Sequence, residues 1–165
     1  MPKLKHYDDL GTARFVTFCC YRMEKSLADH RSKELLIKHL DLARTKHGFK
    51  IIGYVIMPEH VHLVLIPPDK MKLGLVVGEI KSLMAREFFV TAHGGDIRRH
   101  VFWQKRCYDH NCRTTDVAKE KISYWHYNPV RRGLVSQPAD YRWSNYNWYA
   151  GSSEFPLKID AYEFR

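Results

Sequence analysis

Two histidines one residue apart, a tyrosine and an asparagine are the residues of this chain whose types and spacing best suit chemistry. His60 and His62 open an apolar run that follows a turn signal at Met57-Pro58-Glu59. Because side chains alternate faces along a strand, the two imidazoles should point the same way, within reach of one shared ion. Tyr124 and Asn128 are four residues apart, so on a helix they share a face.

These residue types together suggest metal-assisted nucleophilic chemistry. Two imidazoles and one amide oxygen leave a divalent ion with open positions, which a catalytic metal needs to bind a substrate oxygen. A phenol can act as a covalent nucleophile, and a metal that polarises a phosphate oxygen stabilises the charge that develops during displacement. Protonated tyrosine is a poor nucleophile, with a reference pKa of about 10, so its deprotonation needs help that the sequence does not identify.

The remaining pattern predicts the elements that must bring these residues together. Residues typical of strands predict β-strands at 13–20, 50–56, 61–66 and 101–108. Helical spacing of apolar residues predicts helices from Asp29 or Ser32 to about 47, from about 73 to 92, and from 116 to about 127. The order β-α-β-β-α-β followed by a helix predicts an α+β fold, a ferredoxin-like split antiparallel sheet. Its two long helices should lie on one face, and the added C-terminal helix that carries Tyr124 should cover the other.

Particular side chains have expected places in these elements. The basic strand at 101–108 suits a sheet edge. In the helix at 73–92 the expected apolar stripe is Leu75, Val76, Ile80, Leu83, Met84 and Phe88. Lys81 and Arg86 should lie outside that stripe. In the late helix a separate stripe of Ala118, Ile122 and Trp125 should anchor it to the sheet.

The size and composition of the chain predict a single domain over residues 1–165. Its core should span about 13–135, and an aromatic tail, about 136–165, should pack on the domain, cover the active site or stack on bases. Hydrophobic residues make up 45% of the 165 and charged residues 27%, which is ordinary for a soluble protein. No apolar run is long enough for a membrane span, the N-terminus does not resemble a signal peptide, and four cysteines include an adjacent pair. We therefore expect reduced thiols, a cytoplasmic location and no membrane partner.

The net charge points to a nucleic-acid partner. The formal charge is +9, and 13% of the residues are aromatic, which supplies stacking surfaces for unpaired bases. The candidate DNA-backbone contacts are Lys81, Arg86, Arg98, Arg99, Lys105, Arg106, Arg131 and Arg132. Taken alone, each of them is more simply explained as a solvated surface charge.

Three segments carry a resemblance to a known family. They are Met-Pro-Glu-His-Val-His-Leu-Val, Phe-Trp-Gln-Lys-Arg-Cys-Tyr-Asp-His and Tyr-Trp-His-Tyr-Asn-Pro-Val-Arg-Arg-Gly-Leu-Val, which begin at residues 57, 102 and 124. In this order and spacing they resemble the IS200-like transposases, and more closely the REP-associated tyrosine transposases. These are single-tyrosine members of the HUH nuclease superfamily, and the resemblance runs from about Phe15 to about Tyr149.

The resemblance implies a role for each matching residue. His60 and His62 would be metal ligands, Asn128 the third ligand, and Tyr124 the nucleophile. The family reaction cleaves and rejoins single-stranded DNA near hairpins through a 5′-phosphotyrosine and a free 3′-hydroxyl, with Mg²⁺ or Mn²⁺ as cofactor. Imidazole ligands by themselves favour Mn²⁺, Co²⁺ or Zn²⁺ over Mg²⁺.

Three positions near these motifs need separate interpretation. Glu59 stands where many relatives have asparagine; it could bind the metal or repel DNA, but we expect it to face solvent in the turn. Asp109 and His110 match the family's Asp-His pair, and the sequence assigns them no step.

Two other functions and two assemblies stay open at this stage. A domesticated module would bind structured single-stranded DNA without cutting it. A hydrolase of small phosphate esters would use the same histidines, form no covalent adduct and give the basic surface no role. In the assembly, relatives of the IS200 type are dimers that exchange the tyrosine helix, whereas REP-associated relatives can complete the site within one chain, so the protein is either a monomer or a homodimer.

Overall fold

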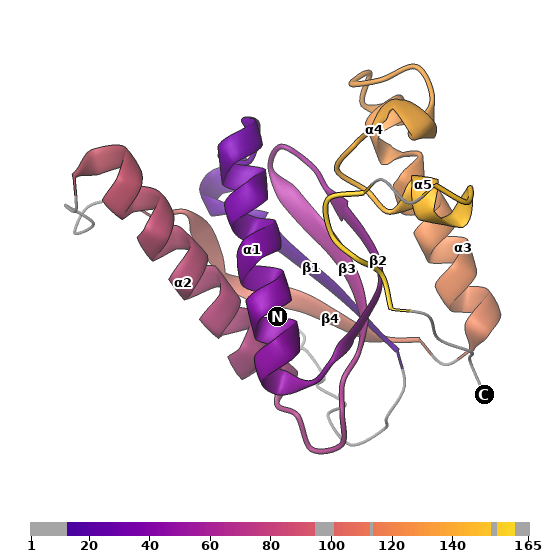
Figure 1. The fold of residues 1–165 in the computed structure, drawn as a ribbon, viewed down its shortest axis with the longest axis horizontal. Helices are drawn as coiled ribbons and strands as arrows, with labels where there is room; N and C mark the ends of the chain where they lie inside the picture. The colour runs from indigo at the N-terminus through magenta and orange to yellow at the C-terminus, as the bar shows by residue number, and fades with distance from the viewer. Residues whose placement is uncertain (1–12, 95–100, 113, 153–154, 161–165) are drawn as a thin grey trace.

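A four-stranded antiparallel sheet forms the centre of the molecule (Figure 1). The computed structural model describes residues 13–94, 101–112, 114–152 and 155–160. The strands are β1 (Arg14–Cys20), β2 (Lys50–Ile56), β3 (His60–Ile66) and β4 (Trp103–Asn111), in the order β2-β3-β1-β4. This is the predicted ferredoxin-like arrangement, with β4 at an edge. β4 begins two residues later than predicted and runs three residues further.

Two long helices, α1 (His30–His47) and α2 (Leu73–His93), lie side by side on one face of the sheet (Figure 1). The ends of α1 follow from local sequence. The Asp29 side chain accepts a hydrogen bond from the backbone N–H of Ser32 at 2.7 Å, which caps the first turn. Gly48 adopts φ 74°, and its N–H bonds to the carbonyl of Arg44, which ends the helix.

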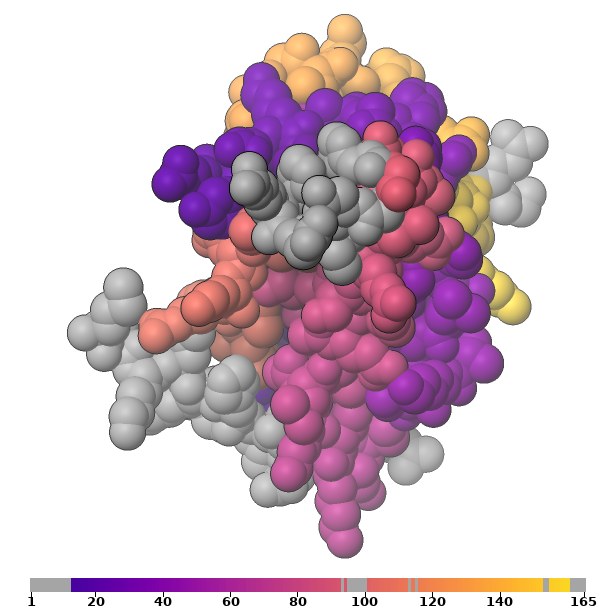
Figure 2. Space-filling model, turned by 90° about the vertical axis from the view of Figure 1, so that its left-hand side faces the viewer, coloured from indigo at the N-terminus to yellow at the C-terminus, as the bar shows by residue number. Residues whose placement is uncertain are grey.

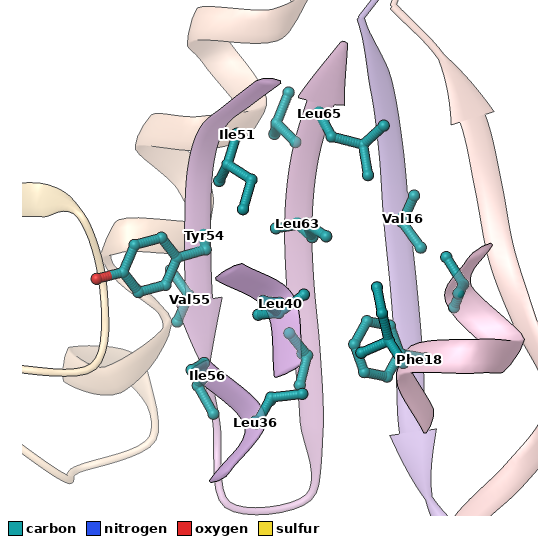
Figure 3. Close-up of a cluster of buried hydrophobic side chains, with 14 of the residues drawn as sticks. Val16, Phe18, Leu36, Leu40, Ile51, Tyr54, Val55, Ile56, Leu63 and Leu65 are labelled. Atoms are coloured by element: carbon teal, nitrogen blue, oxygen red, sulfur yellow. The ribbon is translucent and has the colours of Figure 1, made fainter. Parts of the chain in front are cut away.

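The main core lies between these helices and the sheet. On one face of the sheet lie the side chains of Val16 and Phe18 of β1 and of Leu63 and Leu65 of β3. Leu36 and Leu40 of α1 lie over this face (Figure 3). All six side chains are at most 1% exposed. Leu63 and Leu65 alternate with the two histidines along β3, so burying this face of the strand directs His60 and His62 to the other face.

The second face of the sheet is covered by the C-terminal part of the chain (Figure 1). The helix α3 (Thr115–His126) contacts β2 and β3, and the short α4 (Asn128–Arg131) follows it. Ala118, Ile122 and Trp125 of α3 are buried, as the sequence predicted, and so is His126 at its end. The shorter elements are the 3₁₀ helices η1 (Tyr21–Met23) and η2 (Pro138–Asp140) and the helix α5 (Tyr146–Tyr149).

The aromatic tail packs on the domain along β2. The N–H of Ile56 bonds to the carbonyl of Trp143 at 2.8 Å, and the Tyr141 hydroxyl donates to the carbonyl of Ile56 at 2.6 Å. Tyr141 and Trp143 are 8% and 5% exposed. Of the three expectations for the tail, packing on the domain therefore holds for these two rings.

The predicted apolar stripe of α2 is partly wrong. Leu75 and Leu83 are 70% and 45% exposed, because the buried residues recur at the narrower spacing of Leu73, Val76, Val77, Ile80 and Met84. Lys81 was expected outside the stripe but is 7% exposed. No helix in the described ranges is long and apolar enough to cross a membrane.

Candidate active site

The two histidines at the start of β3 face each other. The Nε2 atom of His60 lies 3.1 Å from the Nε2 atom of His62, and the ring centroids are 4.6 Å apart. Both side chains stand on the face of the sheet that α3 covers, and the His62 ring stacks on the indole of Trp125 at 4.4 Å with an interplanar angle of 8°. The strand thus presents two imidazole nitrogens to one point, as the sequence predicted.

The second nitrogen of each ring is held by a protein oxygen. Nδ1 of His62 lies 2.8 Å from the Thr17 hydroxyl of β1, and Nδ1 of His60 lies 3.1 Å from a carboxylate oxygen of Glu59. A carboxylate can only accept, so Nδ1 of His60 carries the proton and its Nε2 keeps a lone pair. The Thr17 hydroxyl can accept in the same way from His62, which leaves both Nε2 lone pairs directed at the shared point.

Burial keeps both rings neutral near pH 7. Loss of water lowers the pKa of His60, against the opposing effect of Glu59, and lowers the pKa of His62 to about 3. When the Thr17 hydroxyl accepts from Nδ1–H of His62, both Nε2 lone pairs can bind one cation, whereas in the other tautomer Nε2–H of His62 donates to Nε2 of His60. The pair is therefore chemically suited to a metal ion.

The spacing of the nitrogens also suits a metal. Bonds of about 2.1 Å from one ion to two nitrogens, at 90° to 109°, place the nitrogens about 3.0–3.4 Å apart. No group of three or more His, Cys, Asp or Glu side chains among the described residues could hold a metal. A third protein ligand would therefore have to be of another type, such as the amide oxygen of Asn128.

The expectation that Glu59 faces solvent in the turn is wrong. Glu59 is 4% exposed, and its Oε1 accepts from Arg132 as well as from His60. Burial by itself raises the pKa of this carboxyl, but the arginine and the imidazole together hold it below its usual value. Oε2 is buried and has no hydrogen-bond partner among the residues that the structure describes. Arg132 follows α4, so the Glu59–Arg132 ion pair joins the C-terminal helices to the histidine strand within one chain.

The helix α3 approaches the sheet closely at a glycine. A Cβ at Gly53 of β2 would lie 3.2 Å from side-chain atoms of Ile122. A glycine at this point lets the helix lie flat on the strand. This contact and the stacking of Trp125 on His62 together position α3, the helix that carries Tyr124, on the sheet.

Tyr124 itself is 62% exposed and makes its contacts with α4. The guanidinium of Arg131 lies 3.8 Å from the centre of its ring, and Arg131 also donates to the Asn128 side-chain oxygen. The structure therefore gathers Tyr124, Asn128 and Arg131 beside one another. Among the described residues, no hydrogen bond or ring contact joins Tyr124 or Asn128 to the two histidines.

The basic candidates occupy different surroundings. Lys81 is buried, and its ammonium donates to the backbone carbonyls of Gln104 and Lys105 at 2.5 and 3.4 Å. Arg86, Lys105 and Arg106 are exposed. Arg98 and Arg99 lie outside the described residues.

The sequence assigned no role to Asp109 and His110, and it did not identify Thr17 as a residue of the site. Asp109 is 5% exposed and forms a two-point ion pair with Arg14, which is 0% exposed, so its position is explained by a buried structural contact. His110 stacks with Phe15 of β1 at 6.4 Å. Thr17 gave no signal of its own, because its partnership with His62 depends on strand register, which pairs the two residues directly.

Comparisons with known proteins give a consistent picture. A family model described as "Transposase IS200 like" matches residues 10–124. The REP-associated tyrosine transposase of Escherichia coli (strain K12) is 26% identical over 110 residues, which cover 66% of this chain and 61% of that protein. A Haemophilus influenzae protein assigned to the same group is 23% identical over 107 residues, 61% of each chain. The match thus spans about three fifths of each curated relative.

A solved structure shares the fold. It is that of a REP-associated tyrosine transposase bound to a REP hairpin, with a TM-score of 0.74 and 23% identity, and the match covers 99% of this chain and 95% of the other. At this identity the likeness establishes the architecture, including the helix on the second face of the sheet.

Proposed function

Because this chain belongs to the IS200-like transposase family, we propose that it is a metal-dependent transposase that cleaves and rejoins single-stranded DNA beside a hairpin. The observation that carries the proposal is the pair of Nε2 atoms 3.1 Å apart, each ring fixed from behind, under the helix that bears Tyr124. Neither a structural histidine pair nor a simple binding surface needs two neutral imidazoles aimed at one shared point.

His60, His62 and Asn128 are the residues that would hold the metal. When bound, Mg²⁺ or Mn²⁺ supplies Lewis-acid polarisation of a phosphate oxygen. Thr17 and Glu59 keep the imidazoles in the orientation and tautomer that ligation needs. To contribute its amide oxygen, Asn128 would have to release the hydrogen bond that it accepts from Arg131. The freed guanidinium could then bind the phosphate of the incoming DNA.

Tyr124 is the proposed nucleophile. Its phenol oxygen would attack the phosphorus and form a 5′-phosphotyrosine while the bond from phosphorus to the 3′-oxygen breaks. The phenol gives up its proton, and the departing oxygen takes one to become a 3′-hydroxyl. In the reverse reaction that hydroxyl attacks a phosphotyrosine that carries a new strand, so joining needs no external energy source. The exposure of Tyr124 leaves it open to DNA, and Arg131, stacked on its ring, holds it in place.

The proposed substrate is single-stranded DNA with a hairpin at the element end or in a REP-like repeat. A net charge of +9 supports a polyanionic partner, and a relative has been solved with a REP hairpin bound. Arg86, Lys105, Arg106 and Arg131 remain proposed contacts to the DNA backbone. Lys81 is revised, because its ammonium is already occupied by two carbonyls.

We propose that the site is complete within one chain. Trp125 of α3 stacks on His62, and Arg132 pairs with Glu59, so the tyrosine helix and the histidine strand are joined by contacts of the same chain. A monomer is therefore sufficient for the chemistry. A cytoplasmic location is expected for an enzyme that acts on such DNA.

The test is a cleavage assay on a labelled hairpin oligonucleotide with Mn²⁺ or Mg²⁺. A covalent protein–DNA adduct should form with the wild type and with Tyr127→Phe, a matched control one helical turn away. It should be lost in Tyr124→Phe and greatly weakened in His60→Ala. Tight hairpin binding without cleavage in any of several metals would favour the domesticated binding module instead.

A further inference from the structure

The end of α3 is attached to the aromatic tail through one buried histidine. His126, the last residue of α3, is 5% exposed, and its Nε2 atom lies 2.9 Å from the side-chain oxygen of Asn145. Its ring packs edge-on against Tyr146 at 5.5 Å and lies 5.8 Å from the ring of Tyr149, both in α5, which lies beside α3 in Figure 1. From the side of α2, the orange and yellow C-terminal segments show only along the upper and right-hand edges (Figure 2). The contact therefore belongs to the second face of the sheet.

Asn145 is held in turn by the edge strand β2. Its backbone N–H donates to the carbonyl of Tyr54 at 3.2 Å, and its side-chain oxygen accepts from the N–H of Tyr54 at 2.9 Å. Asn145 is 0% exposed, and the nearby Tyr149 hydroxyl donates to the carbonyl of Ile52 in the same strand at 2.9 Å. The acceptor that His126 meets is therefore fixed to the sheet.

The contacts of Asn145 determine which atom donates in its bond with His126. The backbone N–H of Tyr54 can only donate, so the Asn145 atom that it meets is the amide oxygen. An amide oxygen can only accept, so Nε2 of His126 carries a proton and donates it to this bond. A phenylalanine in place of His126 would keep an aromatic ring but lose the donor.

The bond of His126 holds a different side of α3 from the one that packs on the sheet. Successive residues of an α-helix point about 100° apart around its axis. Trp125 and Ile122 both face the sheet, where they contact β3 and β2, and His126 bonds to Asn145 on a neighbouring side. Contacts on one side alone would let the last turn of α3 rotate about its axis, whereas contacts on two sides prevent it. Tyr124 projects from a third side and is 62% exposed.

Rotation of this turn would displace the Tyr124 phenol. Side chains reach about 5–6 Å from a helix axis, so a rotation of about 10–20° moves their ends by about 1–2 Å. A misplacement of about 1 Å in a reacting group can slow a reaction about a hundredfold. A contact that prevents the rotation therefore affects the rate of attack much more than it affects the binding of DNA.

We propose that His126 is a positioning residue for cleavage, which fixes the rotation of the turn that carries Tyr124 by donating a hydrogen bond to Asn145 in the tail. Buried as they are, the two residues act through Tyr124 and need not contact DNA or metal. The aromatic tail is then a working part of the active site as well as a cover for the edge of β2. The inference rests on the proposed function, because that function makes Tyr124 the nucleophile.

The experiment compares two replacements of His126 in single-turnover cleavage of a labelled hairpin oligonucleotide, with the protein in excess and Mn²⁺ present. His126→Phe, which loses the donor, should slow adduct formation by about tenfold or more. His126→Gln places an amide N–H near the position of Nε2 and should recover most of the wild-type rate. Fluorescence anisotropy without metal should give hairpin affinities within about twofold of the wild type for both variants, because the lost contact acts on the rate and not on binding.

Two further variants separate positioning from a general loss of stability. Asn145→Ala removes the same bond from the tail side and should also slow the adduct, and adding His126→Phe to it should cause no further loss. Leu40→Ala, in the core on the other face of the sheet, should destabilise the fold at least as much as His126→Phe. At a temperature where it stays folded, it should form the adduct at the wild-type rate.

The positioning role is overturned if His126→Phe and Asn145→Ala form the adduct at the wild-type rate, or if His126→Gln is as slow as His126→Phe. Equal slowing by Leu40→Ala would likewise overturn it, because the loss would then follow stability. A normal adduct in the wild type alongside any of these results refutes the positioning role alone. Absence of any adduct in the wild type would refute the proposed function, and this role with it.

Discussion

Removal of Arg132 should expose how the two halves of the candidate site are held together. Glu59 is 4% exposed, and in the described part of the chain Oε2 has no hydrogen-bond partner, so Arg132→Met leaves His60 as the one side chain there that bonds to the buried carboxylate. Breaking a fully buried ion pair from one side is unfavourable by about 3–5 kcal/mol. The Arg132 side chain is 49% exposed, so water can replace part of its interaction, and we expect a loss of about 1–3 kcal/mol.

Urea denaturation of three variants measures this effect. Arg132→Met should lower the free energy of unfolding, whereas Arg31→Met, a matched control on α1, should change it by less than about 0.5 kcal/mol. Glu59→Gln with Arg132→Met should recover most of the loss, because a neutral amide needs no counter-charge and can still accept from His60. Additive losses in the double variant, or a loss no larger than that of Arg31→Met, would refute the ion pair as the link between the helices and the strand.

The same link should be visible in metal binding. Glu59→Ala removes the acceptor that fixes Nδ1 of His60, and loss of such a supporting contact typically lowers metal affinity by about 10–100-fold. Calorimetric titration with Mn²⁺ measures it without any DNA. An unchanged affinity would mean that Glu59 plays no part in orienting the imidazole.

Further expectations concern the helix, the pH dependence and the assembly. Gly53→Val should lower the free energy of unfolding by about 1–3 kcal/mol in thermal denaturation, and should also lower the adduct yield, because even a Cβ at this position lies 3.2 Å from Ile122. Gly53→Ala should lower both less. Unchanged yields would contradict the close packing of α3. Without metal, the stabilisation that depends on neutral His62 is complete above about pH 6.5 and is lost as the pH falls towards about 3, because the unfolded chain takes up a proton that the folded chain excludes. Urea titrations between these pH values should show a shallower fall for His62→Gln, and identical slopes would count against the buried neutral ring. Mixing Tyr124→Phe protein with His60→Ala protein should restore no cleavage, whereas recovery in the mixture would mean that two chains share the site.

The sequence predicted the architecture well because the fold depends on local patterns. Alternation along β3 assigned Leu63 and the two histidines to opposite faces, and a capping aspartate and a closing glycine bounded α1. The wrong assignment of Leu75 and Leu83 in α2 arose because several neighbouring residues of this helix are apolar, and only some of them can lie on the buried face. Leu75 and Leu83 are apolar but lie one residue off the buried face.

The supporting contacts of the site could not be predicted in the same way. Glu59 was assigned to solvent because its ionic partner lies 73 residues away, in a segment whose packing the local sequence does not specify. Lys81 was assigned to the surface because its charge favours water, yet its long side chain is buried and its ammonium reaches two carbonyls of the edge strand β4. Both cases depend on tertiary contacts that become visible only when the sheet and its covering helices are in place.

The identity of the residue that becomes attached to DNA tests the central claim most directly. The protein would be incubated with a hairpin oligonucleotide and Mn²⁺, digested with nuclease and trypsin, and the peptide from Ile122 to Arg131 fragmented in a mass spectrometer. We predict a nucleotide mass attached through phosphate to Tyr124. Attachment to Tyr127, or cleaved DNA with no modified peptide, would contradict the account.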